Sequence, residues 1–172
     1  QPNVKAALIR QATARILGSS NIAHELGLLM QKWPKSPTFK VTEKGQIQQA
    51  LADLHKAIAP QVGSLGAVDV AQGMRWLASL AGRDVLFRNP SGDVHSVFNL
   101  YIRRAKLPEI IAAFTAADLG WVLWALGRFR QEGLHKGLVT ALCQRMRSAE
   151  ALGDLSPQSL TNVVQGLARV WH

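Results

Sequence analysis

One seventeen-residue pattern occurs twice near the end of the chain and limits what the chain can fold into. Residues 114–130 read FTAADLGWVLWALGRFR, and residues 155–171 read LSPQSLTNVVQGLARVW, forty-one positions later. Both begin with an apolar residue followed by a hydroxyl residue, and both place aliphatic residues at matching positions. A segment that recurs in this way is typical of proteins built from stacked repeats.

Further copies of the pattern lie upstream. Residues 65–81, LGAVDVAQGMRWLASLA, keep the same aliphatic spacing, and residues 22–33 match it more loosely. Between successive copies lies a second segment whose apolar residues are three and four apart, as in an amphipathic helix. Two long connectors, PKSPTFKVTEKG and GRDVLFRNPSGD, and one short connector, RQEG, explain why the copies are 48, 49 and 41 residues apart.

This alternation predicts an all-α chain, an α-solenoid of stacked helix hairpins with about eight helices and no continuous sheet. Only the short VLF and FKV pieces of the long connectors suggest extended backbone. The expected half-repeats at the two ends leave apolar stripes uncovered, so we expect a longer array or docking on partners, and self-association in isolation. The predicted units are 1–17 (half-repeat), 18–64, 65–113, 114–154 and 155–172 (half-repeat).

Several helix starts and turns are marked by local signals. Thr115 followed by Asp118 has the spacing of a capping box, and Ser156 before Pro157 is a favoured N-cap and first-turn pair. Glycines occupy the positions where we expect the chain to reverse. These are Gly92, Gly133 and Gly153.

The charge balance favours polyanionic partners. The chain has 20 Lys and Arg against 11 Asp and Glu, a net charge of +9. A solubilising charge or an organellar bias toward basic proteins would give the same excess. The first acidic residue is Glu25, after Lys5, Arg10 and Arg15, which fits either a transit peptide or an ordinary amphipathic helix. No apolar run is long enough to span a membrane, and a single cysteine excludes an internal disulfide framework.

The segments 114–130 and 155–171 resemble the first helices of octotricopeptide repeats and of the related repeats of RAP-domain and FAST-kinase-like proteins. The resemblance is good over residues 114–171, moderate over 65–81 and poor over the first sixty residues. It implies a helical repeat protein that binds RNA in a mitochondrion or a chloroplast. The units here are longer than the family's repeat, and no RAP-like domain follows, so the resemblance gives no support to a nuclease role.

Basic residues recur at the ends of the template helices and in the connectors. Arg128 and Arg169 occupy equivalent positions, and stacking would align them along one edge. A second basic surface would be formed by cations from the amphipathic segments that follow two successive copies of the template. Arginine suits phosphate because its planar fork donates two hydrogen bonds, although a solvated helix face explains any single residue equally well. The candidate RNA-binding residues are Lys32, Lys35, Lys40, Lys44, Arg83, Arg88, Arg103, Arg104, Arg128, Arg130, Arg145, Arg147 and Arg169.

All five tryptophans fall in copies of the template helix. They could stack on unpaired bases, but packing between neighbouring helices is the favoured interpretation. The five are Trp33, Trp76, Trp121, Trp124 and Trp171.

Catalytic signatures are missing from the sequence. The five histidines show no metal-ligand spacing, Cys143 falls within the apolar register of its helix, and no phosphate-binding glycine loop occurs. We expect no cofactor and no metal. Together with the resemblance described above, which implies the organellar setting, the sequence predicts a noncatalytic protein that binds RNA, specifically ribosomal RNA in a mitochondrial ribosome, beside neighbouring proteins of that assembly and without a membrane. The alternatives are a chloroplast location and a protein-interaction scaffold of an organellar complex.

Overall fold

The computed structural model describes residues 3–19, 21–35, 41–84, 93–129 and 135–171. These residues form ten α-helices, one 3-10 helix and no strand, which confirms the all-α prediction. The helices are α1 (Val4–Leu17), α2 (Ile22–Lys32), α3 (Val41–Ile58), η1 (Val62–Ser64), α4 (Ala67–Arg83), α5 (Asp93–Ala105), α6 (Pro108–Ala113), α7 (Ala116–Phe129), α8 (Lys136–Met146), α9 (Ala149–Gly153) and α10 (Pro157–Val170).

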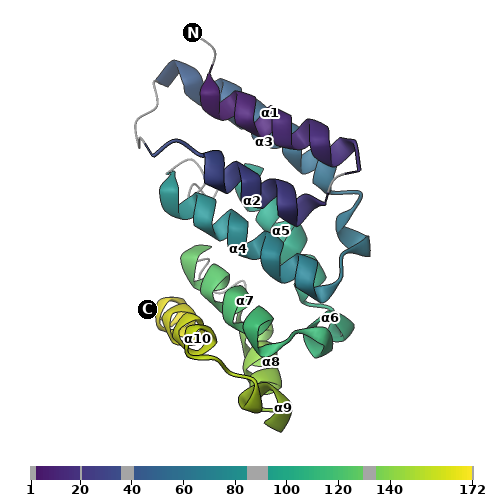
Figure 1. Ribbon diagram of the computed structural model, residues 1–172, viewed down its shortest axis with the longest axis vertical. Helices are drawn as coiled ribbons and strands as arrows, with labels where there is room; N and C mark the ends of the chain where they lie inside the picture. Colours follow the sequence, from purple (N-terminus) through teal and green to yellow (C-terminus); the bar gives the residue numbers. More distant parts are fainter. Residues whose placement is uncertain (1–2, 20, 36–40, 85–92, 130–134, 172) are drawn as a thin grey trace.

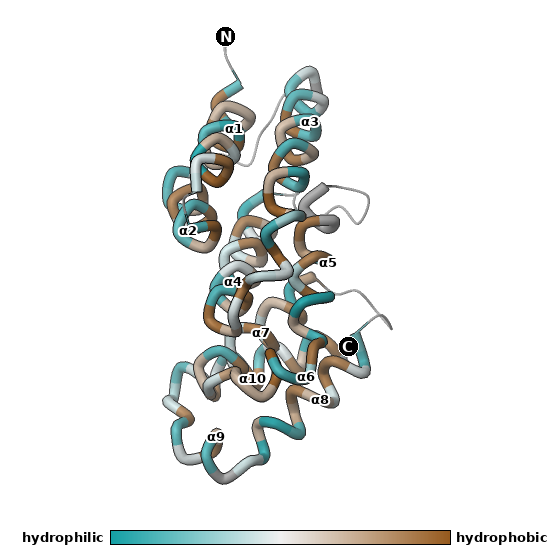
Figure 2. The backbone as a smooth tube through the Cα atoms, turned by 90° about the vertical axis from the view of Figure 1, so that its right-hand side faces the viewer, coloured by the Kyte–Doolittle hydropathy of each residue, from teal (hydrophilic) through white to brown (hydrophobic). Residues whose placement is uncertain are grey.

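The four copies of the template form the helices α2, α4, α7 and α10, which we call the A row. Each A-row helix packs against the next one in chain order, and all four run in the same direction (Figure 1). Helices α3 and α5 pack against each other, while α5 contacts α4 and α8 contacts α7. Figure 2 shows α3, α5 and α8 on one side of the molecule and α2, α4 and α7 on the other. Helix α1 packs against both α2 and α3.

Short helices connect the second helix of each unit to the next A-row helix. They are η1 after α3, α6 after α5 and α9 after α8, so the three full units share one order of elements. The expected eight helices correspond to the eight that have 11 residues or more. The prediction missed α6 and α9, of 6 and 5 residues, because such short helices show no apolar period.

Local hydrogen bonds explain where two A-row helices begin. The Thr115 N–H donates to Asp118 Oδ2 over 3.0 Å, and the Asp118 N–H donates to Thr115 Oγ1 over 3.2 Å, which confirms the predicted capping box. At α10, the Ser159 N–H donates to Ser156 Oγ over 3.1 Å, with Pro157 in the first turn. Of the predicted turn glycines, Gly153 ends α9, while Gly92 and Gly133 lie outside the described residues. So do the VLF piece and the first two residues of FKV.

The A row is held together by glycines that allow helix backbones to approach closely. A Cβ added to Gly166 of α10 would lie 2.3 Å from the Leu123 carbonyl oxygen of α7. Gly127 of α7 makes the reciprocal approach, since a Cβ there would lie 2.6 Å from the Gly166 carbonyl oxygen. Between α4 of the A row and α5 beside it, Gly73 of α4 lies against the ring of the fully buried Tyr101 of α5.

A buried ion pair joins α1 to the end of α4. Lys5 Nζ lies 2.5 Å from Asp84 Oδ2, and both side chains are almost completely buried. The same ammonium group lies 5.6 Å from the centroid of the Trp33 ring at the end of α2. Because a buried charge is costly without a partner, this contact fixes how α1 sits on the A row.

Candidate nucleic-acid interface

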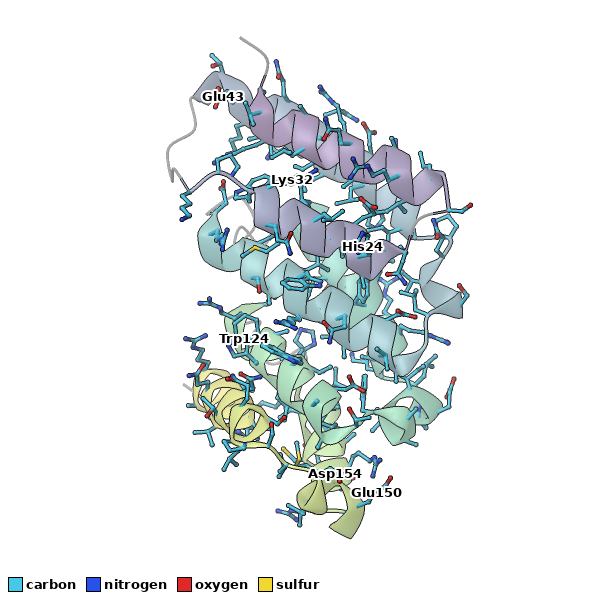
Figure 3. The ribbon with its side chains drawn as sticks, in the orientation of Figure 1. His24, Lys32, Glu43, Trp124, Glu150 and Asp154 are labelled. Atoms are coloured by element: carbon cyan, nitrogen blue, oxygen red, sulfur yellow. The ribbon has the colours of Figure 1, made fainter. Side chains whose placement is uncertain are left out.

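The C-terminal ends of the A-row helices meet at one edge of the molecule, which we call the A-row edge. In Figure 1 all four ends lie on the left, and Figure 3 labels Lys32 between α1 and α2. Each of these helices carries a cation in its last turn. Such cations are favoured at the negative end of a helix dipole. The four residues are Lys32, Arg83, Arg128 and Arg169.

The arginines of this edge also contact the preceding A-row helix. Arg83 Nη1 donates to the Met30 carbonyl oxygen of α2 over 3.2 Å. The guanidinium of Arg128 lies over Gly82 of α4, where an added Cβ would come within 2.7 Å of Nη2. Two of the four cations, Arg83 and Arg128, are therefore held against the preceding A-row helix.

A chain of tryptophan and arginine side chains extends from this edge along α4 and α7. The guanidinium carbon of Arg75 lies 4.5 Å from the centroid of the Trp76 ring and 3.9 Å from that of Trp121. Trp121 meets Trp124 edge to face at 5.6 Å, and Arg128 lies 5.1 Å from the Trp124 centroid. Figure 3 shows Trp124 between α4 and α7. Burial lowers the pKa of Arg75 from its usual value.

These contacts agree with packing as the main role of four tryptophans. Trp33 is buried, and Trp76 lies against Gly27 of α2. In Trp121 and Trp124 at least one ring face is covered by a guanidinium. The exception is Trp171, which is 71% exposed at the end of α10. Arg75 was missed by sequence reasoning, and its place directly before Trp76 was the available signal.

Arg104 and Arg145, near the C-terminal ends of α5 and α8, lie at the opposite edge, where each contacts the start of the A-row helix in the same unit. Arg104 Nε donates to the Leu65 carbonyl oxygen over 2.9 Å, and Arg145 Nη2 donates to the Phe114 carbonyl oxygen over 3.2 Å. Arg145 also donates to Ser148 Oγ over 2.8 Å. These two arginines therefore connect α5 and α8 to the A row. Their neighbours Arg103 and Arg147 are exposed.

The remaining candidates are placed by the connectors. Lys35, just after α2, and Lys44, in the first turn of α3, are both exposed. Helix α3 begins at the A-row edge, so these two lysines extend the same side of the molecule (Figure 1). Lys40, Arg88 and Arg130 lie outside the described residues.

The described part of the chain contains no group of three His, Cys, Asp or Glu residues that could hold a metal ion. Cys143 packs against the hydrophobic core, as its register predicted. None of the described helices is long and apolar enough to cross a membrane.

Two acidic residues mark a region remote from the A-row edge. Figure 3 shows Glu150 and Asp154 at α9, at the other end of the molecule from Lys32.

Comparisons of the chain with protein families, with curated proteins and with solved structures gave no match.

Proposed function

We propose that this chain is a noncatalytic helical-repeat protein that binds organellar RNA along the A-row edge. The observation that carries the proposal is the recurrence of a last-turn cation in all four A-row helices. Phosphates repeat along a nucleic-acid strand, so a row of cations set by helix stacking suits this ligand. The net charge of +9 adds long-range attraction for any polyanion.

The arrangement of the A-row edge favours recognition of the RNA backbone. Arg83 and Arg128 are held by contacts to the preceding helix, so little side-chain freedom would be lost when they bind phosphate. Most tryptophan rings are engaged in packing, so base stacking is not part of the proposal. We expect most of the affinity to come from phosphate contacts and to vary little with base sequence.

The sequence resemblance to octotricopeptide-type repeats adds the cellular setting to this proposal. Under this proposal, the chain is a helical repeat array that stabilises ribosomal RNA within the mitochondrial ribosome. A chloroplast is the alternative location. Neighbouring proteins of that assembly would contact its remaining surfaces.

Crosslinking tests the proposal in cells. The native protein would be irradiated, purified under denaturing conditions, and its attached RNA sequenced while its crosslinked peptides are mapped. We expect organellar ribosomal RNA, attached to peptides from the ends of α2, α4, α7 and α10. Recovery of no RNA, or of crosslinks confined to α9 and the opposite edge, would contradict the proposal.

A second candidate function is that of a protein-interaction scaffold. The observation that favours it is the exposure of large apolar side chains on α10, where Val164 is 58% and Trp171 is 71% exposed. Salt separates the two functions, because binding through phosphates weakens steeply as salt rises and apolar docking does not. Strong RNA-free association with one protein in high salt would favour the scaffold.

A further inference from the structure

Arg75 of α4 is stacked against two tryptophan rings where α4 meets α7. Its guanidinium carbon lies over the Trp76 ring of its own helix at 4.5 Å and over the Trp121 ring of α7 at 3.9 Å, measured to the ring centroids. Such distances are those of a guanidinium stacked on aromatic faces. The N–H groups of a guanidinium point outward in its own plane, so stacking leaves them available as donors.

The donors of Arg75 are little used within the chain. The one acceptor that it reaches among the described residues is Gln72 Oε1, which lies 3.5 Å from Nη1, too far for a strong hydrogen bond. None of the ion pairs in the described part of the chain includes Arg75. By contrast, Arg104 and Arg145 donate to backbone carbonyl oxygens over 2.9 and 3.2 Å. Arg75 therefore has N–H groups to spare for a ligand.

The surroundings of Arg75 favour an anion as that ligand. The side chain is half-buried, and it is burial that lowers its pKa from the usual value. A partly desolvated cation that has no carboxylate partner is stabilised by an oxyanion, because opposite charges attract more strongly away from bulk water. The planar fork suits a phosphate group in particular, since it can donate two parallel hydrogen bonds to two phosphate oxygens.

A series of ring contacts links Arg75 to the A-row edge. Trp121 meets Trp124 edge to face at 5.6 Å, and Arg128 of the edge lies 5.1 Å from the Trp124 centroid. Figure 3 labels Trp124 where α4 and α7 meet. Arg75 comes eight residues before Arg83, which corresponds to about 12 Å along the axis of α4. A nucleic-acid strand bound at the edge needs to extend only about two helical turns to reach Arg75.

From these contacts we infer that Arg75 is a further phosphate-binding residue of the RNA site, held in place by Trp76 and Trp121. It binds one phosphate group of the RNA backbone through its in-plane N–H groups, while the two indole rings fix its orientation. The inference rests on the proposed RNA binding. It extends the path of the RNA from the ends of the A-row helices onto the surface where α4 meets α7.

Titration of a single-stranded RNA with Arg75 variants of the full chain tests the inference. Arg75→Gln removes the charge, so it should weaken binding about tenfold. The slope of log K against log salt should become shallower by about 0.7, as expected for one lost phosphate contact. The matched control is Arg10→Gln, which removes an exposed arginine of α1 and should leave affinity and slope nearly unchanged. Circular dichroism would check that both variants fold.

Arg75→Lys separates a phosphate contact from a packing role. Lysine keeps the charge but loses the planar fork, so this variant should keep the wild-type salt slope and bind RNA about threefold more weakly. Equal affinities of the wild type and Arg75→Lys would exclude the two-donor contact and overturn the inference. This comparison also decides if Arg75→Gln fails to fold.

Failure of the inference and failure of the proposed function give different results. If the wild type binds RNA and Arg75→Gln binds it as tightly as Arg10→Gln does, Arg75 has a packing role only, and RNA binding at the A-row edge still stands. If the wild-type chain binds no RNA, both proposals are wrong. Weaker binding and a shallower slope in Arg75→Gln, with the slope restored in Arg75→Lys, support a phosphate at Arg75.

Discussion

Replacing Gly166 by alanine should separate α7 from α10. The added Cβ would lie 2.3 and 2.4 Å from the carbonyl oxygen and carbon of Leu123 and 2.8 Å from the Trp124 nitrogen. All three are backbone atoms of a helix, so no side-chain rotation can relieve the contact. A carbon needs about 3.5 Å from such atoms, so the helices must move apart by roughly 1 Å.

The size of the effect follows from two opposing contributions. Overpacking of this kind costs about 1–3 kcal/mol. An alanine within a helix is more favourable than glycine by about 1 kcal/mol. The expected net change is a loss of up to about 2 kcal/mol in the free energy of unfolding. For a chain of this length, that lowers Tm by up to about 8 °C.

Thermal unfolding followed by circular dichroism is the assay, and Gly137→Ala is the matched control. Gly137 lies in α8 with nothing within 4 Å of an added Cβ, so this variant gains helix propensity without a clash and should be slightly more stable than the wild type. If Gly166→Ala is as stable as Gly137→Ala, the close packing of α10 on α7 is refuted.

Three further perturbations test how α1 and α5 are held against the A row. Asp84→Asn should destabilise the chain by about 3–5 kcal/mol because it leaves the buried Lys5 charge without its carboxylate, whereas Lys5→Met with Asp84→Leu should recover most of the loss in urea unfolding. Arg104→Gln should lower the free energy of unfolding by about 1–2 kcal/mol in the same assay, because the hydrogen bond to Leu65 is lost. The control Arg103→Gln, at an exposed position, should change it very little. Equal effects of the two substitutions would argue against the contact to Leu65. Burial, with the nearby Asp69 charge, raises the pKa of Tyr101 above its usual 10.0. The folded pKa exceeds the unfolded one, so this tyrosine contributes stability below pH 10 that is lost as the pH rises further. Because the chain has one tyrosine, tyrosinate absorbance should appear only together with loss of helix, and its appearance in the folded chain would contradict this burial.

Sequence periodicity was sufficient for the long helices because the apolar residues of α2, α4 and α7 are buried against neighbouring helices, and α10 repeats their spacing. The pairs Thr115 with Asp118 and Ser156 with Pro157 also located two helix starts from local chemistry. The short helices α6 and α9 could not be predicted, because their packing depends on tertiary contacts rather than on a repeating pattern. Which cations face solvent could not be predicted either, because this also depends on tertiary contacts.

The candidate site shows that limit most clearly. Arg128 and Arg169 could be assigned to one edge from their equivalent positions, because stacking repeats a position in space. The contact of Arg145 with the Phe114 carbonyl joins residues 31 positions apart, and no local signal distinguishes Arg145 from the exposed Arg147. Arg75 lies between tryptophans of two helices, a contact that requires knowing how α4 meets α7.

The salt dependence of RNA binding tests the central claim most directly. The full chain would be titrated with a single-stranded RNA at several salt concentrations, as wild type and as an A-row edge variant, Lys32→Gln with Arg83→Gln and Arg169→Gln. A control variant removes three exposed cations elsewhere and gives the same net charge. Its substitutions are Arg10→Gln, Lys56→Gln and Lys106→Gln.

If the A-row edge binds phosphates, the edge variant should bind every RNA more weakly, and the slope of log K against log salt should become shallower by about 2, as expected for three lost phosphate contacts. The control variant should keep nearly the wild-type slope. Equal slopes and affinities for the edge and control variants would contradict the claim, as would a wild-type chain that binds no RNA.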